Sequence, residues 1–346
     1  MPGEPGSHNG SPDPSGMEEA REAVEHFRKT YQAVVDEVRK VIVGHEPVIA
    51  EVMTCLLAGG HGLVEGVPGL GKTLLVRTLS RALDVRFSRI QFTPDLMPAD
   101  IVGTNVIAED EHGNRRFEFE PGPIFGNVVL ADEINRATPR TQSACLEAMQ
   151  ETAVTIARTR HALEEPFMVL ATQNPIEMEG TYPLPEAQLD RFLLKIRMGS
   201  PSVHELMEIV ERTTVGVPVS ARAVASGPDI LRMRELVREV PVASHIKEYV
   251  ARLVLATHPE TPDAPEITRR YIRYGASPRG AQAVTLAAKV RALVQGRHHV
   301  SRQDVQTSVL PALRHRILFT FEGQAENLDP DRVLAEILDH VAEPES

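Results

Sequence analysis

The chain has 346 residues, of which 42% are hydrophobic and 25% charged, and its formal net charge is −11. This composition is typical of a globular protein with a buried core, and the acidic balance argues against a surface that follows nucleic-acid phosphates. No apolar run approaches the ~18 residues of a membrane helix, and residues 1–16 lack the basic start and apolar middle of a secretory signal. We therefore expect a cytoplasmic protein.

The chain begins with residues 1–16, which are rich in Gly, Pro, Ser and Asn and predict a disordered tail. Apolar residues then recur every three or four positions through 17–43 and again through 46–58, which predicts two helices. The second pattern stops at the glycine pair that follows it. Cys55 and Cys145 lie in helix-like segments far apart in the sequence, so we expect two buried thiols and no disulfide.

Short apolar runs and helix patterns alternate through the next part of the chain. Strands are predicted at 62–66, 85–93, 127–133 and 166–174, and helices at 73–83 and 138–151. Because strands that alternate with helices form a parallel sheet covered on both faces, this part predicts an α/β fold. Strand-like arms around polar turns predict two β-hairpins, at 105–122 and 153–167.

From about residue 203 onward the patterns are helical and are punctuated by Pro and Gly. We therefore expect an α/β core at 17–200 and a smaller all-α domain at 201–346. Its histidines lack metal-ligand spacing, so we interpret them as ordinary surface residues of that domain: His298, His299 and His315.

Residues 66–73 read GVPGLGKT and match the pattern G-x-x-x-x-G-K-[ST] between a strand and a helix. Three glycines let the backbone turn its N–H groups toward phosphate oxygens, and the helix start adds a positive dipole end. Lys72 is predicted to contact the β- and γ-phosphates and Thr73 to bind Mg²⁺. The nucleotide contacts assigned to this loop and helix start are Gly66, Pro68, Gly69, Leu70, Gly71, Lys72, Thr73 and Leu74.

Polar residues end two of the predicted strands. In VVLADE, Asp132 is predicted to hold the water shell of Mg²⁺, and Glu133 to act as the base that activates water. In VLATQNP, Asn174 is placed to orient that water. The competing interpretation is an acidic strand cap and an ordinary turn Asn, which is common when such residues occur alone.

Two arginines complete the set of candidates. Arg191 lies in LPEAQLDRF, and Arg279 lies in GASPRG at the start of a long helix. Arginine suits transition-state charge because its planar fork binds phosphate oxygens and stays protonated. A single arginine is most often a solvated surface residue, so neither residue stands by itself.

In chain order, GVPGLGKT, VLADEINRATPRTQSACLEAMQE, ATQNPIEMEGTYPLPEAQLDRF and GASPRG resemble the MoxR family of AAA+ ATPases over roughly residues 25–320. The resemblance implies a P-loop αβα core with an all-α lid, and Mg²⁺-dependent hydrolysis of ATP to ADP. It implies that Asn174 is sensor 1 and that Arg191 is an arginine finger for the neighbouring subunit. Arg279 is then sensor 2, which ties the lid to the γ-phosphate. Val43 and Gly44, in VIVGH, line the adenine pocket.

A finger that acts on the neighbouring subunit leaves a monomer incomplete, so the resemblance implies a ring, usually a hexamer. The leading hypothesis is a chaperone-like remodeller of a protein partner, in this family often one with a von Willebrand A domain. Both hairpins are then expected to face the central pore or the partner. The alternatives are a motor that remodels nucleic acid and the ATPase subunit of a magnesium-chelatase-like complex, and the acidic balance disfavours the first.

Overall fold

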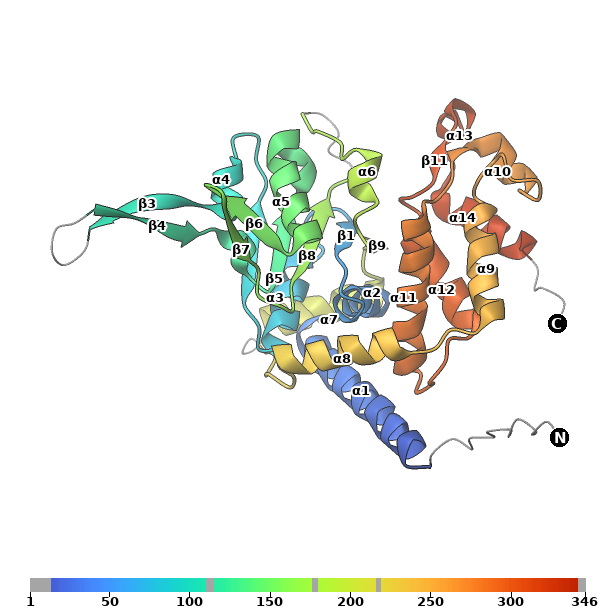
Figure 1. Ribbon diagram of the computed structural model, residues 1–346, viewed down its shortest axis with the longest axis horizontal. Coiled ribbons are helices and arrows are strands. Elements are labelled where there is room, and N and C mark those ends of the chain that lie inside the picture. The colour runs from blue at the N-terminus through green and yellow to red at the C-terminus, as the bar shows by residue number, and fades with distance from the viewer. Residues whose placement is uncertain (1–13, 110–114, 176–179, 216–218, 342–346) are drawn as a thin grey trace, which may run out of the picture.

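We describe the protein from a computed structural model, in which residues 14–109, 115–175, 180–215 and 219–341 are described (Figure 1). The first elements are two helices, α1 (Pro14–Val41) and α2 (Glu46–Leu57), as the apolar spacing predicts. Most of the predicted tail, residues 1–13, lies outside the described residues. Among the described residues, no helix is both long and apolar enough to cross a membrane.

A five-stranded sheet with the order β2-β5-β8-β1-β9 forms the centre of the α/β part. All four pairs of neighbouring strands are parallel, which confirms the predicted sheet. The apolar runs of β5 and β8 are fully buried, as two-sided cover requires. The strands are β1 (Gly62–Glu65), β2 (Phe87–Gln91), β5 (Val128–Asp132), β8 (Met168–Gln173) and β9 (Leu194–Arg197).

The connections between these strands are helices and two antiparallel hairpins, as predicted. The first hairpin projects far from the body of the protein as a two-stranded ribbon (Figure 1). Its base is held by Phe119, whose ring centroid is 4.0 Å from that of His161 in the second hairpin. The elements are α3 (Lys72–Ala82), α4 (Pro98–Val102), β3 (Gly103–Glu109), β4 (Arg115–Pro121), α5 (Pro139–Glu151), β6 (Ala153–Ile156), β7 (Thr159–Ala162) and α6 (Glu186–Leu189), with 3₁₀ turns η1 (Pro123–Phe125) and η2 (Ile134–Arg136).

The C-terminal part is helical, with one feature that sequence patterns did not predict. A short antiparallel pair, β10 (Ile272–Tyr274) and β11 (Leu318–Phe319), joins two of its loops. The helices are α7 (Val203–Thr214), α8 (Gly227–Glu239), α9 (Ser244–Leu255), α10 (Glu266–Tyr271), α11 (Pro278–Val294), α12 (Arg302–Leu313), α13 (Phe321–Ala325) and α14 (Pro330–His340).

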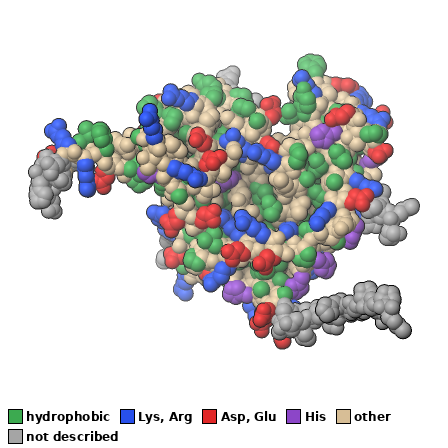
Figure 2. All heavy atoms as spheres, in the orientation of Figure 1, with side chains coloured by type: hydrophobic (Ala, Val, Ile, Leu, Met, Phe, Trp, Pro, Cys, Tyr) green, Lys and Arg blue, Asp and Glu red, His purple; other side chains and the backbone are tan. Residues whose placement is uncertain are grey.

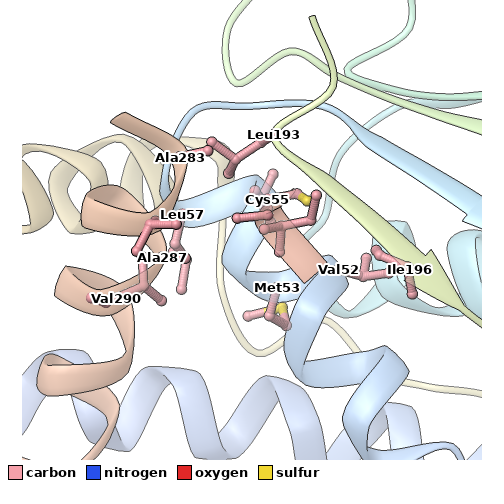
Figure 3. Close-up of a cluster of buried hydrophobic side chains, with 14 of the residues drawn as sticks. Val52, Met53, Cys55, Leu57, Leu193, Ile196, Ala283, Ala287 and Val290 are labelled. Atoms are coloured by element: carbon pink, nitrogen blue, oxygen red, sulfur yellow. The ribbon is translucent and has the colours of Figure 1, made fainter. Parts of the chain in front are cut away.

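The helical part and the sheet share one hydrophobic core. Figure 3 shows Val52 and Met53 of α2 packed between Ile196 of β9 and the α11 residues Ala287 and Val290. A second apolar cluster covers the other face of the sheet and includes buried residues of α5. The apolar packing therefore continues across the boundary expected near residue 200.

Five side chains test the expectations about cysteine and histidine. Cys55 and Cys145 are free and buried, as predicted. His298 and His299 are exposed, but the expectation for His315 is wrong. Its ring is buried, with Nε2 3.0 Å from the carbonyl oxygen of Phe192, because the end of α12 packs on the segment that leads into β9.

Candidate functional site

The loop at residues 66–73 joins the end of β1 to the start of α3. Gly69 and Gly71 both have φ +85°, in the left-handed region that favours glycine. A Cβ built on either glycine meets nothing within 4 Å, so no other group packs against the loop at these two positions. Gly66, by contrast, is packed, because a Cβ there would lie 2.8 Å from the carbonyl oxygen of Met198. The loop thus has a packed base and two unobstructed glycines at a helix N-terminus, a position that favours anions.

Lys72 is the first residue of α3, and its ammonium donates to the carbonyl oxygen of Gly66 at 2.7 Å. Burial lowers the pKa of Lys72, while the negative charges of Asp132 and Glu133 act in the opposite direction. The lysine therefore lies within electrostatic reach of both predicted acids, although β8 separates β5 from β1 in the sheet.

Asp132 ends β5, and Glu133 follows it directly. Asp132 Oδ1 accepts a hydrogen bond of 2.6 Å from the hydroxyl of Thr172, and that hydroxyl accepts the N–H of Glu133 at 2.8 Å. The backbone of Glu133 is left-handed, with φ 57°. A non-glycine residue in this region costs on the order of 1–3 kcal/mol and is typical of functional sites.

Side chains from neighbouring segments hold the second carboxylate. Glu133 Oε2 accepts hydrogen bonds from Gln91 Nε2 at 2.9 Å and from Arg136 Nη1 at 2.8 Å. Arg89, two residues before Gln91 on β2, donates to Asp132 Oδ2 at 2.7 Å. Each predicted acid is therefore fixed through one oxygen by a donor on the edge strand.

Asn174 directly follows β8, which runs between the loop-bearing strand and the acidic strand. Its neighbour Gln173 is in register with Glu65, and Gln173 O accepts the N–H of Gly66 at 3.3 Å. The side chain of Asn174 is only 5% exposed. Asn174 thus leaves the sheet on the strand between the loop-bearing and the acidic strands, and its role as a sensor stays a prediction.

The predicted adenine segment precedes α2. Val43 is buried, and Gly44 has φ +66°. A Cβ on Gly44 would lie 2.0 Å from Glu205 Oε1, so α7 packs closely against this backbone. Arg212 of α7 donates to two carbonyl oxygens at the end of α1, at 3.2 and 3.0 Å. Contact with adenine stays a prediction for both residues.

The donors near the loop fit Mg²⁺, which prefers oxygen ligands and keeps several of its waters. Thr73 supplies a hydroxyl in the first turn of α3, and Asp132 supplies a carboxylate that is 13% exposed. In the part of the chain that is described, no group of three or more His, Cys, Asp or Glu could hold a metal ion. A magnesium ion here therefore needs phosphate oxygens and waters as further ligands.

The two candidate arginines line the same cavity, and the loop at 66–74 does not. Arg191 and Arg279 line one cavity of about 230 Å³, and no residue of 66–74 lines it. Arg191 Nη1 donates to the carbonyl oxygen of Leu146 at 3.0 Å. Burial lowers the pKa of Arg316 in the same cavity, and the positive charge of Arg279 adds to this effect. The structure thus places Arg279 and Arg191 at one cavity, which the loop of their own chain does not line.

Sequence patterns missed the residues that support these two groups. Gln91, Arg89 and Thr172 hold the acids, while Asp190 and Arg316 surround the arginines. A polar residue on an edge strand is typical of a solvated face. The only signal in the sequence was that polar residues stand at the alternate positions 89 and 91, which places them on the same face of the strand. The contact of Arg316 with Asp190 joins residues 126 positions apart.

Comparison with known proteins gives a consistent result. A family model described as "ATPase family associated with various cellular activities (AAA)" matches residues 61–194, and an AAA lid domain model matches residues 264–337. The chain is 42% identical to Chaperone MoxR1 of Mycobacterium tuberculosis, over 99% of this chain and 89% of that protein. It is 32% identical to Protein MoxR of Paracoccus denitrificans, over 84% of this chain and 89% of that protein.

A crystal structure from Cytophaga hutchinsonii, described as that of a candidate ATPase, shares the fold with a TM-score of 0.88 and 39% identity. The match covers 95% of this chain and 99% of that one.

Proposed function

The chain belongs to the MoxR family of AAA+ ATPases, and we propose that it hydrolyses ATP with Mg²⁺ to remodel a protein partner. Family models match both the P-loop core and the helical lid, and the Cytophaga structure shares this fold. The observation that carries the proposal is the convergence of Lys72, Asp132 and Glu133 at the carboxyl edge of one sheet. Open α/β sheets bind nucleotides at this edge.

Each residue near the loop has one role in this proposal. The backbone N–H groups of 66–73 and the ammonium of Lys72 hold the phosphates. Thr73 and, through water, Asp132 would hold Mg²⁺, which when bound would neutralise charge on the phosphate oxygens. Glu133 takes a proton from the attacking water, which Asn174 orients.

The separate position of the arginines supports a site shared between subunits. Arg191 and Arg279 line a cavity that the loop of the same chain does not reach. Both side chains then act on nucleotide held by a neighbouring copy, whose charge they stabilise in the transition state. Such a head-to-tail contact closes into a ring, and we assign a hexamer.

The partner is a protein client, because one relative is named a chaperone. The projecting ribbon β3–β4 offers a contact surface for it. Ile107 and Phe117 are directly paired across the ribbon and are 64% and 77% exposed. Figure 2 shows hydrophobic and basic side chains next to one another along this ribbon. Exposed apolar groups of this kind mark interaction sites, and we assign the ribbon to a client with a von Willebrand A domain.

Steady-state hydrolysis and binding of a fluorescent ATP analogue test the activity. The wild-type protein is expected to hydrolyse ATP only with Mg²⁺. Lys72→Ala should lose nucleotide binding, whereas Glu133→Gln should bind the analogue normally and lose turnover. A normal rate for Glu133→Gln would remove that residue from the role of base.

Two additions to the same assay separate the classes of partner. A purified von Willebrand A domain protein is expected to change the ATPase rate of the wild type but not that of a variant with Ile107→Ser and Phe117→Ser. Single-stranded DNA is expected to leave the rate unchanged. A salt-sensitive stimulation by DNA would instead favour a motor that remodels nucleic acid.

A further inference from the structure

Asp190 lies between α6 and β9, directly before the candidate finger Arg191. Its carboxylate accepts hydrogen bonds from the hydroxyl of Ser277, at 3.0 Å to Oδ1 and 2.9 Å to Oδ2. The guanidinium of Arg316 donates through Nε to Oδ1 at 2.8 Å. One carboxylate from the α/β part is thus bound to two separate segments of the helical part.

Ser277 is the N-cap of α11, the helix that carries Arg279 in its first turn. The Ser277 hydroxyl accepts the N–H of Arg279 at 3.2 Å while it donates to Asp190. A single hydroxyl therefore links the backbone of Arg279 to the carboxylate next to Arg191.

Arg316 closes the arrangement from the other side. Its Nη2 donates to the carbonyl oxygens of Asp190 at 3.0 Å and of Phe192 at 2.7 Å. These two carbonyls flank Arg191 in the chain, so the backbone of the finger is fixed on both sides. Arg316 is buried, with a side chain only 3% exposed, and Asp190 supplies its paired negative charge. Removal of that charge would leave a buried cation without its partner.

We propose that Asp190, with Ser277 and Arg316, is a positioning residue that joins Arg191 and Arg279 into one rigid two-arginine unit for the neighbouring nucleotide. The inference rests on the proposed function, in which both arginines act across the subunit interface. Three guanidinium groups around one cavity repel one another, and the carboxylate of Asp190 offsets this repulsion. Donors that are fixed before the reaction need no reorganisation as charge develops on the phosphate.

The first test compares substitutions at the two ends of the link. Asp190→Asn keeps the size of the side chain but removes its charge, and we expect kcat to fall on the order of tenfold to a hundredfold. ATP affinity should not change, because Asp190 has no contact with the phosphate-binding loop at 66–73 among its hydrogen bonds to Ser277 and Arg316. Ser277→Ala should lower kcat severalfold, and Ser277→Thr should restore it because the hydroxyl is kept.

The matched control is Ser301→Ala. Ser301 is the N-cap of α12 and bonds to Asp304 within its own capping box, so its loss removes a cap but no link to the finger. We expect its kcat to equal that of the wild type. Equal effects of Ser277→Ala and Ser301→Ala would show a capping role alone and overturn the inference.

A double-mutant comparison separates positioning from general stability. In a protein that already carries Arg279→Ala, Asp190→Asn should lower kcat by a smaller factor than in the wild type, because one of the two arginines that it positions is gone. A further loss as large as that in the wild type would overturn the inference. If wild type hydrolyses ATP and Arg191→Ala slows it while Asp190→Asn does not, the inference alone fails. If wild type hydrolyses no ATP, the proposed function fails with it.

Discussion

The guanidinium of Arg89 and the carboxylate of Asp132 face each other across β2 and β5, with Nη2 2.7 Å and Nε 3.2 Å from Oδ2. The other oxygen of Asp132 accepts the hydroxyl of Thr172. Both oxygens of the residue assigned to the magnesium water shell therefore have a protein donor. A water of a bound ion must therefore share a carboxylate oxygen with Arg89 or Thr172, or displace one of them.

We expect Arg89→Ala to lower the Mg²⁺ concentration that half-saturates binding of a fluorescent ATP analogue. Because the side chain of Arg89 is 46% exposed, the ion pair is worth about 0.3–1 kcal/mol, which corresponds to a roughly two- to fivefold shift. The titration is made with Glu133→Gln in both proteins, so that no analogue is hydrolysed.

The matched control for this titration is Arg86→Ala, which removes the exposed ion pair with Glu164 just before the same strand. It should leave the Mg²⁺ requirement unchanged. A higher Mg²⁺ requirement for Arg89→Ala would contradict competition and show that the arginine helps to hold the ion.

Glu51 of α2 lines a cavity of about 140 Å³ between α2, α11 and α12, together with Arg291. Burial raises the pKa of its carboxyl group from 4.5 to about 7, the positive charge of Arg314 opposes the rise, and Asp331 adds to it. Because the folded pKa is the higher one, protonated Glu51 favours the folded state. This contribution is complete below pH 4.5 and is lost as the pH rises through about 7.

The free energy of unfolding, measured with urea, checks this sign. Between pH 5 and pH 8 the wild type should lose on the order of 2 kcal/mol relative to Glu51→Gln, whose side chain does not titrate. Glu51→Gln should also be the more stable protein at pH 8. A stability difference between the two proteins that does not vary with pH would show that Glu51 is ionised throughout.

The local parts of the site follow from sequence, and the long-range parts do not. Strand, loop and helix around Lys72, and the acids at the end of β5, are encoded by neighbouring residues, and the structure shows these elements where they were predicted. Arg89 and Gln91 reach the acids only because β2 pairs with β5. That pairing depends on how the whole sheet assembles, which a polar residue on an edge strand does not reveal.

Sequence patterns also did not predict where the helical part packs on the α/β part. Its helices are periodic and predictable, but their position depends on packing such as that of α2 against α11. The buried His315 and the position of Arg279 beside Arg191 follow from this packing. No local pattern separates a surface histidine from one that bonds to a carbonyl 123 residues away.

Gly103 starts the projecting ribbon with φ +92°, and a Cβ there would lie 2.2 Å from Glu120 O. Gly103→Ala therefore forces β3 and β4 apart at their base, at a cost on the order of 1–3 kcal/mol. We expect a lower Tm and faster limited proteolysis within 103–121, with unchanged nucleotide affinity. The control is Gly199→Ala, because a Cβ on Gly199 meets nothing within 4 Å. Equal protease sensitivity of both variants would contradict the strain at Gly103.

Arg191 lines a cavity that the loop at 66–74 does not line. If Arg191 acts on the nucleotide of a neighbour, as proposed, subunits with complementary defects should repair one another. Arg191→Ala keeps Glu133, and Glu133→Gln keeps the arginine. In rings formed from equal amounts of both, about one quarter of the sites combine an intact Glu133 with an intact Arg191 from the neighbour. Each variant alone should hydrolyse ATP near background, and the mixture should recover about one quarter of wild-type turnover.

The control mixture combines Arg191→Ala with a chain that carries both Arg191→Ala and Glu133→Gln. No subunit then supplies the arginine, so no recovery is expected. A finger that acts within its own chain leaves both mixtures inactive, because every subunit carries a defect in its own site. Recovery in the first mixture and not in the second therefore requires that Arg191 completes the site of a neighbour.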